Sequence, residues 1–314
     1  NERVANILQA TKGINVISPT WFYLNDNDGN IYSLASRDYV TYCHEQGVEV
    51  WGLISNLENP EADTTYVMTH TSTRDYLTNQ IIAAAIEYDL DGINLDFEAL
   101  SSEAGDAYVQ FIRELSIKCE NNDLVLSVDN YVPTSYTEFY NRAEQAVFAD
   151  YIIIMAYDEH YSGSEDIGSV SSIGFVQNGV KNTLKEVPAE QTILGLPFYS
   201  RIWELTPKEG SGEDVQAASE DYVPYTFTCS EEGMQTTEDI CTGNGAKMVW
   251  SEEDGQYVAE YESEGKRHKV WMENEESLEQ KLKVMKENNL AGAAYWKLGL
   301  ERPAAWDTII KYVN

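Results

Sequence analysis

The chain has 314 residues, of which 43% are hydrophobic and 11% aromatic, a composition typical of a globular protein and not of a disordered one. Its length fits one large barrel or two medium domains. The formal net charge of −32 argues against nucleic acids and anionic membranes as partners, because phosphate binding needs clustered Lys and Arg.

Short apolar runs alternate with helical patterns along most of the chain. Helical spacing predicts helices over residues 2–10, 72–88, 103–120 and 275–289. Seven apolar runs predict buried strands over residues 13–23, 47–55, 91–98, 124–131, 150–157, 192–199 and 291–298. Strands that alternate with helices indicate an α/β fold with a parallel sheet, and over this length a (β/α)8 TIM barrel. Because only seven strands are found, we expect the first barrel strand to be missing from this chain.

The alternation stops between the last two predicted strands. This stretch contains turn-rich segments and a hairpin-like pair of runs over residues 246–262 and 266–273. We predict a small inserted α+β subdomain over residues 205–272. Residues 1–204 are then the first part of the barrel, and residues 273–314 supply its last helix, strand and helix.

The most informative stretch is DGINLDFE, residues 91–98. Side chains alternate along a strand, so Asn94, Asp96 and Glu98 share one face of it. Glu98 lies at the carboxyl end, where barrel enzymes place catalytic residues. Two neighbouring carboxylates resist ionising together, which favours a protonated Glu98 that acts as an acid. The alternative is an ordinary strand that ends in a solvated acidic loop, but burying these polar groups without a function is costly.

Cysteine and histidine spacing predicts no metal site and no cofactor. The four cysteines form no CxxC pair, and the four histidines show no ligand spacing. Cys229 and Cys241 are close enough in sequence for a disulfide, and both the bridged and the free state stay open. No apolar run reaches the length of a membrane-spanning helix, so we expect no membrane insertion.

Four segments together resemble glycoside hydrolase family 18. DGINLDFE resembles that family's Asp-Gly-x-Asp-x-Asp-x-Glu signature, and residues 155–158 (MAYD) resemble its Met-x-Tyr-Asp motif. Residues 193–201 (ILGLPFYSR) and 292–298 (GAAYWKL) resemble its seventh and eighth strands. The order and spacing match over nearly the whole chain. DFE in place of the commoner DWE, the loop EHYSGS and the segment VWM resemble bacterial spore-cortex and cell-wall members, which are similar to N-acetylglucosaminidases acting on peptidoglycan fragments.

The resemblance implies a role for each matching residue. Glu98 would protonate the glycosidic oxygen, and Asp96 would hold the substrate's acetamido group while its carbonyl oxygen attacks the anomeric carbon. Tyr157 would donate a hydrogen bond to that acetamide. Asp158 would orient the sugar or the site, and Trp296 would stack under the sugar. This is a retaining, substrate-assisted route that needs no protein nucleophile.

One residue departs from the family pattern. Asn94 stands where the signature has the first of the acidic residues that alternate along one face of the strand. In the family, that Asp normally shares charge and hydrogen bonds with the next acidic residue. An amide keeps the hydrogen bonding and removes a negative charge. We expect Asn94 to face the substrate site and to alter the tuning of Asp96 without abolishing activity.

Further substrate-binding candidates end or follow predicted strands. For each of them a structural role is the alternative. They are Asn56, Asn130, His160, Tyr199 and Arg201.

These observations predict a glycosidase that cleaves β-linked N-acetylglucosamine-containing glycans, either peptidoglycan or cortex fragments or a chitin-like polymer. The alternative is a catalytically silent, lectin-like glycan-binding protein on the same fold. Family members of that kind usually lack the acid, so Glu98 favours the enzyme. A neutral glycan polymer or oligosaccharide is compatible with the charge. We expect a bacterial monomer that is secreted or associated with the cell envelope or spore.

Overall fold

The computed structural model describes residues 2–208 and 225–313. The chain divides into two compact units. Unit 1 comprises Asn1–Met155, Gly179–Leu194 and Asn289–Gly292. Unit 2 comprises Ala156–Asn178, Gly195–Asn288 and Ala293–Asn314.

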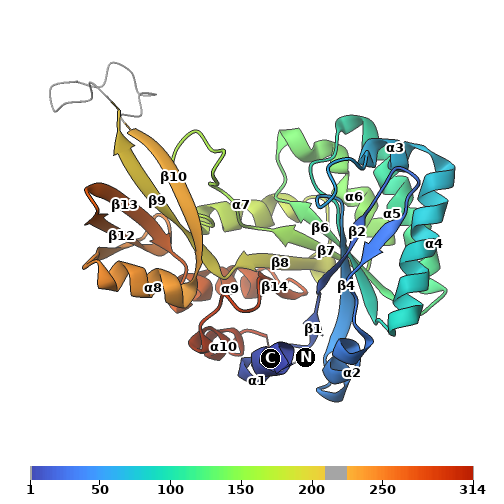
Figure 1. Cartoon of the computed structure of the whole chain (residues 1–314), viewed down its shortest axis with the longest axis horizontal. Coiled ribbons are helices and arrows are strands. Elements are labelled where there is room, and N and C mark those ends of the chain that lie inside the picture. The colour runs from blue at the N-terminus through green and yellow to red at the C-terminus, as the bar shows by residue number, and fades with distance from the viewer. Residues whose placement is uncertain (1, 209–224, 314) are drawn as a thin grey trace. The chain divides into compact units, whose positions relative to one another are not determined.

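The core of unit 1 is a mainly parallel sheet (Figure 1). β2, β4, β5, β6 and β7 pair in that order with parallel register, β1 pairs with β4, and β3 joins the edge antiparallel to β2. The strands are β1 (Val16–Ile17), β2 (Thr20–Leu24), β3 (Ile31–Ser33), β4 (Glu49–Ser55), β5 (Gly92–Asp96), β6 (Val125–Tyr131) and β7 (Tyr151–Met155).

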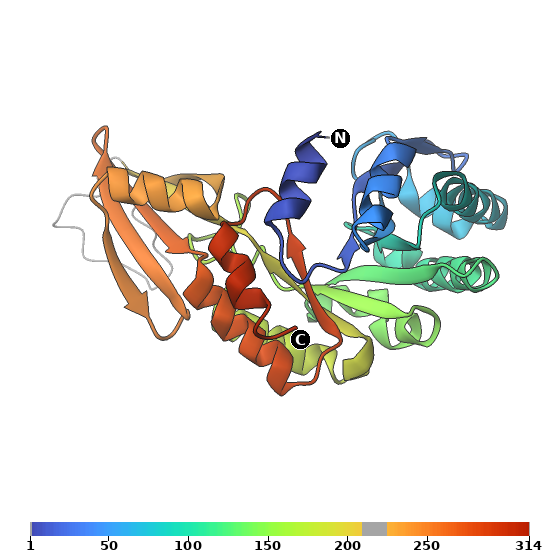
Figure 2. The same ribbon diagram turned by 90° about the horizontal axis from the view of Figure 1, so that it is seen from below.

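Helices lie beside these strands in Figures 1 and 2. Their N-termini follow the expected chemistry, since Ser36 and Asp63 each accept a hydrogen bond from a backbone N–H in the first turn of the helix that follows. The α-helices of unit 1 are α1 (Glu2–Ala10), α2 (Arg37–Glu45), α3 (Thr64–Thr69), α4 (Thr71–Tyr88), α5 (Gly105–Glu120) and α6 (Arg142–Phe148). Short 3-10 turns cover Ser102–Ala104, Ser135–Tyr140 and Ala189–Gln191.

The chain passes between the units inside three elements. These are α7 (Ile173–Thr183), β8 (Thr192–Pro197) and β14 (Gly292–Trp296). The seven runs that the sequence predicts as strands overlap β2, β4, β5, β6, β7, β8 and β14, so this prediction is confirmed. Upstream of Val16, the segment Glu2–Ala10 forms α1, as the sequence also predicts.

Unit 2 contains an antiparallel five-stranded sheet in the order β10-β9-β13-β12-β11. Its strands are β9 (Tyr199–Pro207), β10 (Tyr225–Gly233), β11 (Lys247–Ser251), β12 (Gln256–Ser263) and β13 (Lys266–Met272), and its helices are α8 (Met234–Gly243), α9 (Glu275–Glu287) and α10 (Pro303–Ile309). Ile202, Cys241, Ala259 and Val270 pack in a small core of their own. The domain boundaries at 204/205 and 272/273 stay a prediction, and residues 209–224 of the predicted subdomain lie outside the described residues.

The cysteines resolve the alternative that the sequence left open. All four lie in the described residues and are free thiols, so Cys229 and Cys241 are not bridged. Burial raises the pKa of the Cys241 thiol to about 11. In the parts of the chain that the structure describes, no helix is both long and apolar enough to cross a lipid bilayer.

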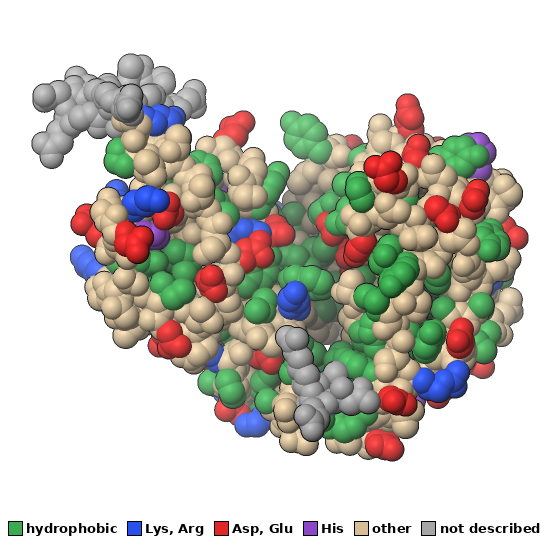
Figure 3. Space-filling view, in the orientation of Figure 1, with side chains coloured by type: hydrophobic (Ala, Val, Ile, Leu, Met, Phe, Trp, Pro, Cys, Tyr) green, Lys and Arg blue, Asp and Glu red, His purple; other side chains and the backbone are tan. Residues whose placement is uncertain are grey.

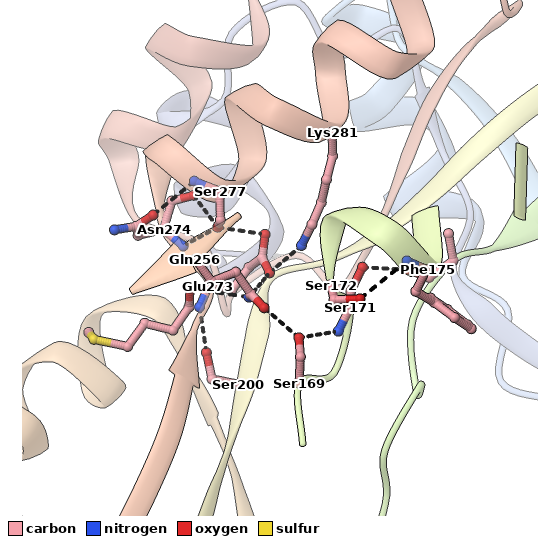
Figure 4. Close-up of polar contacts among 12 residues, drawn as sticks. Ser169, Ser171, Ser172, Phe175, Ser200, Gln256, Glu273, Asn274, Ser277 and Lys281 are labelled. Carbon is pink, nitrogen blue, oxygen red and sulfur yellow. Dashed lines mark hydrogen bonds and ion pairs between the residues drawn. The ribbon is translucent and has the colours of Figure 1, made fainter. Parts of the chain in front are cut away.

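A buried ion pair holds part of unit 2 together (Figure 4). Lys281 of α9 reaches the carboxylate of Glu273, which follows β13, with an Nζ to Oε2 distance of 2.6 Å. The two side chains are 0% and 1% exposed. Glu273 also accepts hydrogen bonds from Gln256 of β12 (3.1 Å) and from Ser277 of α9 (3.0 Å). The pair therefore connects the five-stranded sheet to α9.

The surface reflects the acidic composition. Figure 3 shows Asp and Glu side chains spread over the visible face, with few Lys and Arg among them. Such a surface repels polyanions and supports solubility.

Candidate functional site

Asn94 and Asp96 lie on one face of β5, and together with Glu98 beyond the strand end they are called the polar ladder. Asn94 lies opposite Leu53 of β4 and Ser127 of β6, and Asp96 lies opposite Ser55. Phe97 is buried on the other side, where its ring stacks on Phe111 of α5 at 5.7 Å between centroids. The alternation therefore separates a polar face from a helix-packed one, as strand geometry requires.

Asp91 and Gly92 begin the same motif and have structural roles. The Asp91 carboxylate accepts the N–H of Val50 (2.7 Å) and lies 2.8 Å from Nε2 of His44. A Cβ on Gly92 would lie 2.8 Å from the carbonyl oxygen of Val125, so only glycine fits between the strands here. These two residues fix where β5 begins.

Asn94 connects the ladder to β6. Its Nδ2 donates to Oδ2 of Asp129 at 3.0 Å, and its Oδ1 accepts from the hydroxyl of Ser127 at 2.7 Å. Burial raises the pKa of Asp129 well above its usual range, the negative charge of Asp96 raises it further, and the Asn94 hydrogen bond opposes this. The Asp129 carboxyl therefore favours its protonated form.

Asp96 has a strongly perturbed carboxyl. Burial raises its pKa to about 7, and the charges of Glu98 and Glu58 add to this. A carboxyl that titrates near neutrality can change its protonation state during a reaction at modest cost. This behaviour separates Asp96 from an ordinary surface acid.

Asn56, which follows β4, fixes the backbone of Glu98. Its Oδ1 accepts the Glu98 N–H at 2.8 Å, and its Nδ2 donates to the Glu98 carbonyl at 2.9 Å. The same Nδ2 donates to the hydroxyl of Thr64 at 3.1 Å. The hydrogen bonds of the Asn56 amide therefore position Glu98. The predicted contact of Asn56 with sugar stays a prediction.

Two tyrosines hold the next two residues. Ala99 has a φ of 52°, a left-handed conformation that an L-residue adopts at a cost, and its N–H donates to the hydroxyl of Tyr131 at 3.1 Å. The N–H of Leu100 donates to the hydroxyl of Tyr140 at 3.2 Å. Burial raises the pKa of Tyr131, and the charge of Glu98 raises it further. The backbone N–H groups of Glu98, Ala99 and Leu100 are therefore each held by a side chain.

A second group of the predicted residues lies in unit 2. The hydroxyl of Tyr199 donates to Oδ1 of Asp158, and Arg201 donates to the same oxygen at 2.9 Å. Arg201, which is 5% exposed, also donates to the carbonyl of His160 (2.8 Å) and to Glu231 of β10 (2.6 Å). Burial raises the pKa of Tyr199, and the charge of Asp158 adds to it. Arg201 therefore connects the start of the loop after β7 to the five-stranded sheet.

The other predicted residues of unit 2 differ in whether contacts within the protein already occupy their side chains. The Tyr157 ring makes an edge contact with the Tyr199 ring, with 6.4 Å between centroids. The His160 ring lies 2.9 Å from the carbonyl oxygen of Ser169, an interaction that braces its own loop. Trp296 is 37% exposed, which leaves part of its ring open to a ligand. The roles of these residues toward sugar stay predictions.

Sequence reasoning missed Asp129 and selected its neighbour. Asn130 is 1% exposed and exchanges two hydrogen bonds, of 2.7 and 3.2 Å, with Gln145 of α6. The structure brings Asp129 to the ladder and places Asn130 on the helix-packed side. The signal was present, because a period of two along β6 puts Asp129 on the face of Ser127.

Comparison with known proteins identifies a family and several relatives of this chain. The model of "Glycosyl hydrolases family 18" matches residues 43–301. The chain is 26% identical over 312 residues to YvbX, an uncharacterized glycosylase of Bacillus subtilis (strain 168), over 95% of this chain and 84% of that protein. It is 28% identical over 271 residues to the cortical fragment-lytic enzyme of the same organism, over 83% of this chain and 59% of that enzyme.

The fold has a solved counterpart. The crystal structure of the spore cortex-lytic enzyme SleL from Bacillus megaterium QM B1551 matches with a TM-score of 0.84 at 22% identity, over 99% of this chain and 70% of that one. The fold is an α/β TIM barrel with a small α+β insertion between its seventh and eighth strands. The chain belongs to glycosyl hydrolase family 18 and is a glycosidase of that family.

Proposed function

We propose that this glycosidase cleaves β-linked N-acetylglucosamine-containing glycans with retention of configuration, and that Glu98 is its general acid and base. The observation that carries the proposal is the arrangement around Glu98. Its backbone is fixed on both sides by Asn56, and the neighbouring Asp96 has a pKa raised to about 7. Precise placement of an acid supports catalysis, because small displacements of a reacting group are costly.

In the proposed reaction Glu98 gives its proton to the glycosidic oxygen as the bond to the leaving sugar breaks. The carbonyl oxygen of the substrate's acetamido group attacks the anomeric carbon, and an oxazolinium ion forms. Asp96 in its ionised form accepts the acetamido N–H and stabilises the positive charge. Water then attacks the anomeric carbon, the bond between that carbon and the acetamido oxygen breaks, and Glu98 recovers its proton from that water. The acetamido group is held intramolecularly, where effective molarities are very high.

The proposed substrate is a glycan of spore cortex or cell wall. Two relatives are named for lysis of cortex or of cortical fragments, which supports this class over other glycans that contain N-acetylglucosamine. We accordingly infer that the protein is bacterial and acts in the envelope or spore, or after secretion.

The test compares the wild type with Glu98→Gln on two substrates, purified cortex fragments and chito-oligosaccharides. Products are separated by chromatography, and the anomer formed first is identified by proton NMR. We expect β-anomeric products from cortex fragments and a loss of about 10²- to 10⁴-fold in kcat for Glu98→Gln. Glu103→Gln, on an exposed turn nearby, is the matched control and should keep wild-type activity.

Three results would count against the proposal. They are the absence of product from both substrates, equal activity of Glu98→Gln and the wild type, and first formation of the α-anomer. Cleavage of chito-oligosaccharides alone would replace the cortex with a chitin-like substrate.

A further inference from the structure

The polar ladder contains one carboxylate fewer than the family signature, because Asn94 stands at the position of its first Asp. A carboxylate of the neighbouring strand β6, that of Asp129, lies beside Asn94. Asn94 pairs in register with Ser127, so Asp129 comes two residues further along the same face of β6. The amide of Asn94 donates directly to Asp129. Asp129 therefore stands next to the position where the signature has its first Asp.

Asp129 is buried and Asp96 is partly buried, which is unusual for acids that have no catalytic or binding role. Asp129 is 8% exposed. Oδ1 of each carboxyl is buried and has no hydrogen-bond partner within residues 2–208 and 225–313. Ionising both at once would leave two buried charges without cations, which is costly. A single proton placed between them removes one charge and supplies one donor.

The hydrogen bonds of Asn94 indicate where that proton belongs. The Ser127 hydroxyl donates to Oδ1 of Asn94, so the Nδ2 of Asn94 faces Asp129. Oδ2 of Asp129 must then act as an acceptor, and the proton on Asp129 belongs on Oδ1, the atom without a partner.

We propose that Asp129 supplies, from β6, the carboxylate that the family signature places at position 94 on β5, and that Asp96 and Asp129 share one proton. This inference deepens the proposed function and rests on it. The two carboxyls hold that proton between them until the acetamido group arrives, and it then settles on Oδ1 of Asp129. Asp96 is left ionised to accept the acetamido N–H, and no proton enters or leaves the pair. Asp129 acts through Asp96, so it is a positioning residue.

Other titratable groups surround the pair, but among the described residues no cation affects the pKa of either carboxyl. Burial and neighbouring carboxylates raise the pKa of both carboxyls, and within the described residues only the hydrogen bond from Asn94 favours ionised Asp129. Electrostatic interactions link the pair to four further titratable groups, Glu58, Glu98, Tyr108 and Tyr140.

The test moves the carboxylate between the two strands. Four proteins are compared: the wild type, Asp129→Asn, Asn94→Asp and the double variant Asn94→Asp/Asp129→Asn. The double variant has the same number of carboxylates as the wild type and restores the signature on β5. Initial rates are measured on cortex fragments and chito-oligosaccharides over a range of pH, and circular dichroism checks that each variant folds.

We expect Asp129→Asn to lose about 10²-fold in kcat. The pH limb that reports Asp96 should move to lower pH, because a neighbouring negative charge has been removed. In the double variant the rate and the pH profile should return toward those of the wild type. Wild-type kcat and pH profile in Asp129→Asn would overturn the inference, as would a double variant no better than Asp129→Asn.

A second measurement keeps the inference separate from the proposed function. Carbon-13 NMR of labelled aspartate carboxyls follows Asp96 through its titration in the wild type and in Asp129→Asn. We expect its apparent pKa to fall by at least about one unit in the variant. If the wild type cleaves no glycan, the proposed function fails, and this titration still decides the inference. An Asp96 titration that Asp129→Asn leaves unmoved would refute the shared proton.

Discussion

Replacement of Lys281 by Met removes the cation from the buried pair shown in Figure 4. The change keeps the length and the apolar stem of the side chain, but it leaves the Glu273 carboxylate buried with only hydrogen bonds from Gln256 and Ser277. Breaking a buried ion pair from one side costs about 3–5 kcal/mol of folding free energy. For a chain of this size, about 2 °C of Tm is lost per kcal/mol, so Tm should fall by about 6 to 10 °C.

The loss should also depend on pH. Burial raises the pKa of Glu273, and Lys281 opposes this, so Lys281→Met raises the pKa further. A carboxyl whose pKa is higher in the folded than in the unfolded state stabilises the fold below its unfolded pKa, and that contribution is lost as pH rises through the folded value. The deficit of Lys281→Met should therefore be smaller at about pH 5 than at about pH 8.

The assay is urea unfolding followed by circular dichroism, run at both pH values, with a thermal melt as a second readout. Lys283→Met on the exposed side of α9 is the matched control and should stay close to the wild type. Glu273→Gln/Lys281→Met should regain part of the loss, because the amide keeps an acceptor for Ser277 without a buried charge. A Lys281→Met protein within about 1 kcal/mol of the wild type at both pH values would refute the reasoning.

Three further predictions concern the site. Asn56→Ala removes both hydrogen bonds to the Glu98 backbone, so kcat should fall by about 10²-fold with a small change in KM; steady-state kinetics that show only a raised KM would contradict this. Tyr131→Phe leaves the Ala99 N–H without its acceptor and should cost about 1–3 kcal/mol in urea unfolding, whereas an unchanged midpoint would argue against the contact. Arg201→Lys keeps the charge but loses the planar fork, and should lower Tm by a few degrees; a melt matching the wild type would show that the fork is dispensable.

Local pattern was sufficient for much of this protein. The strands and helices followed from periods of two and of 3.6 residues, because each element must bury one face. The motif over residues 91–98 identified Asp96 and Glu98, since period-two alternation places both on the face opposite Phe97. The same rule applied to β6 would have found Asp129.

Only the tertiary structure decided what these side chains contact. Asn56 and Glu98 are 42 residues apart, and no local rule pairs an amide after one strand with the backbone after another. The join between Asp129 and Asn94 depends on the register of β5 against β6, which is set by packing across the sheet. The chemistry of a residue type is local, whereas burial and the approach of charges across strands are not. The sequence by itself therefore determined which residues could act as acids, and the fold decided which of their pKa values are raised by burial and by neighbouring charges.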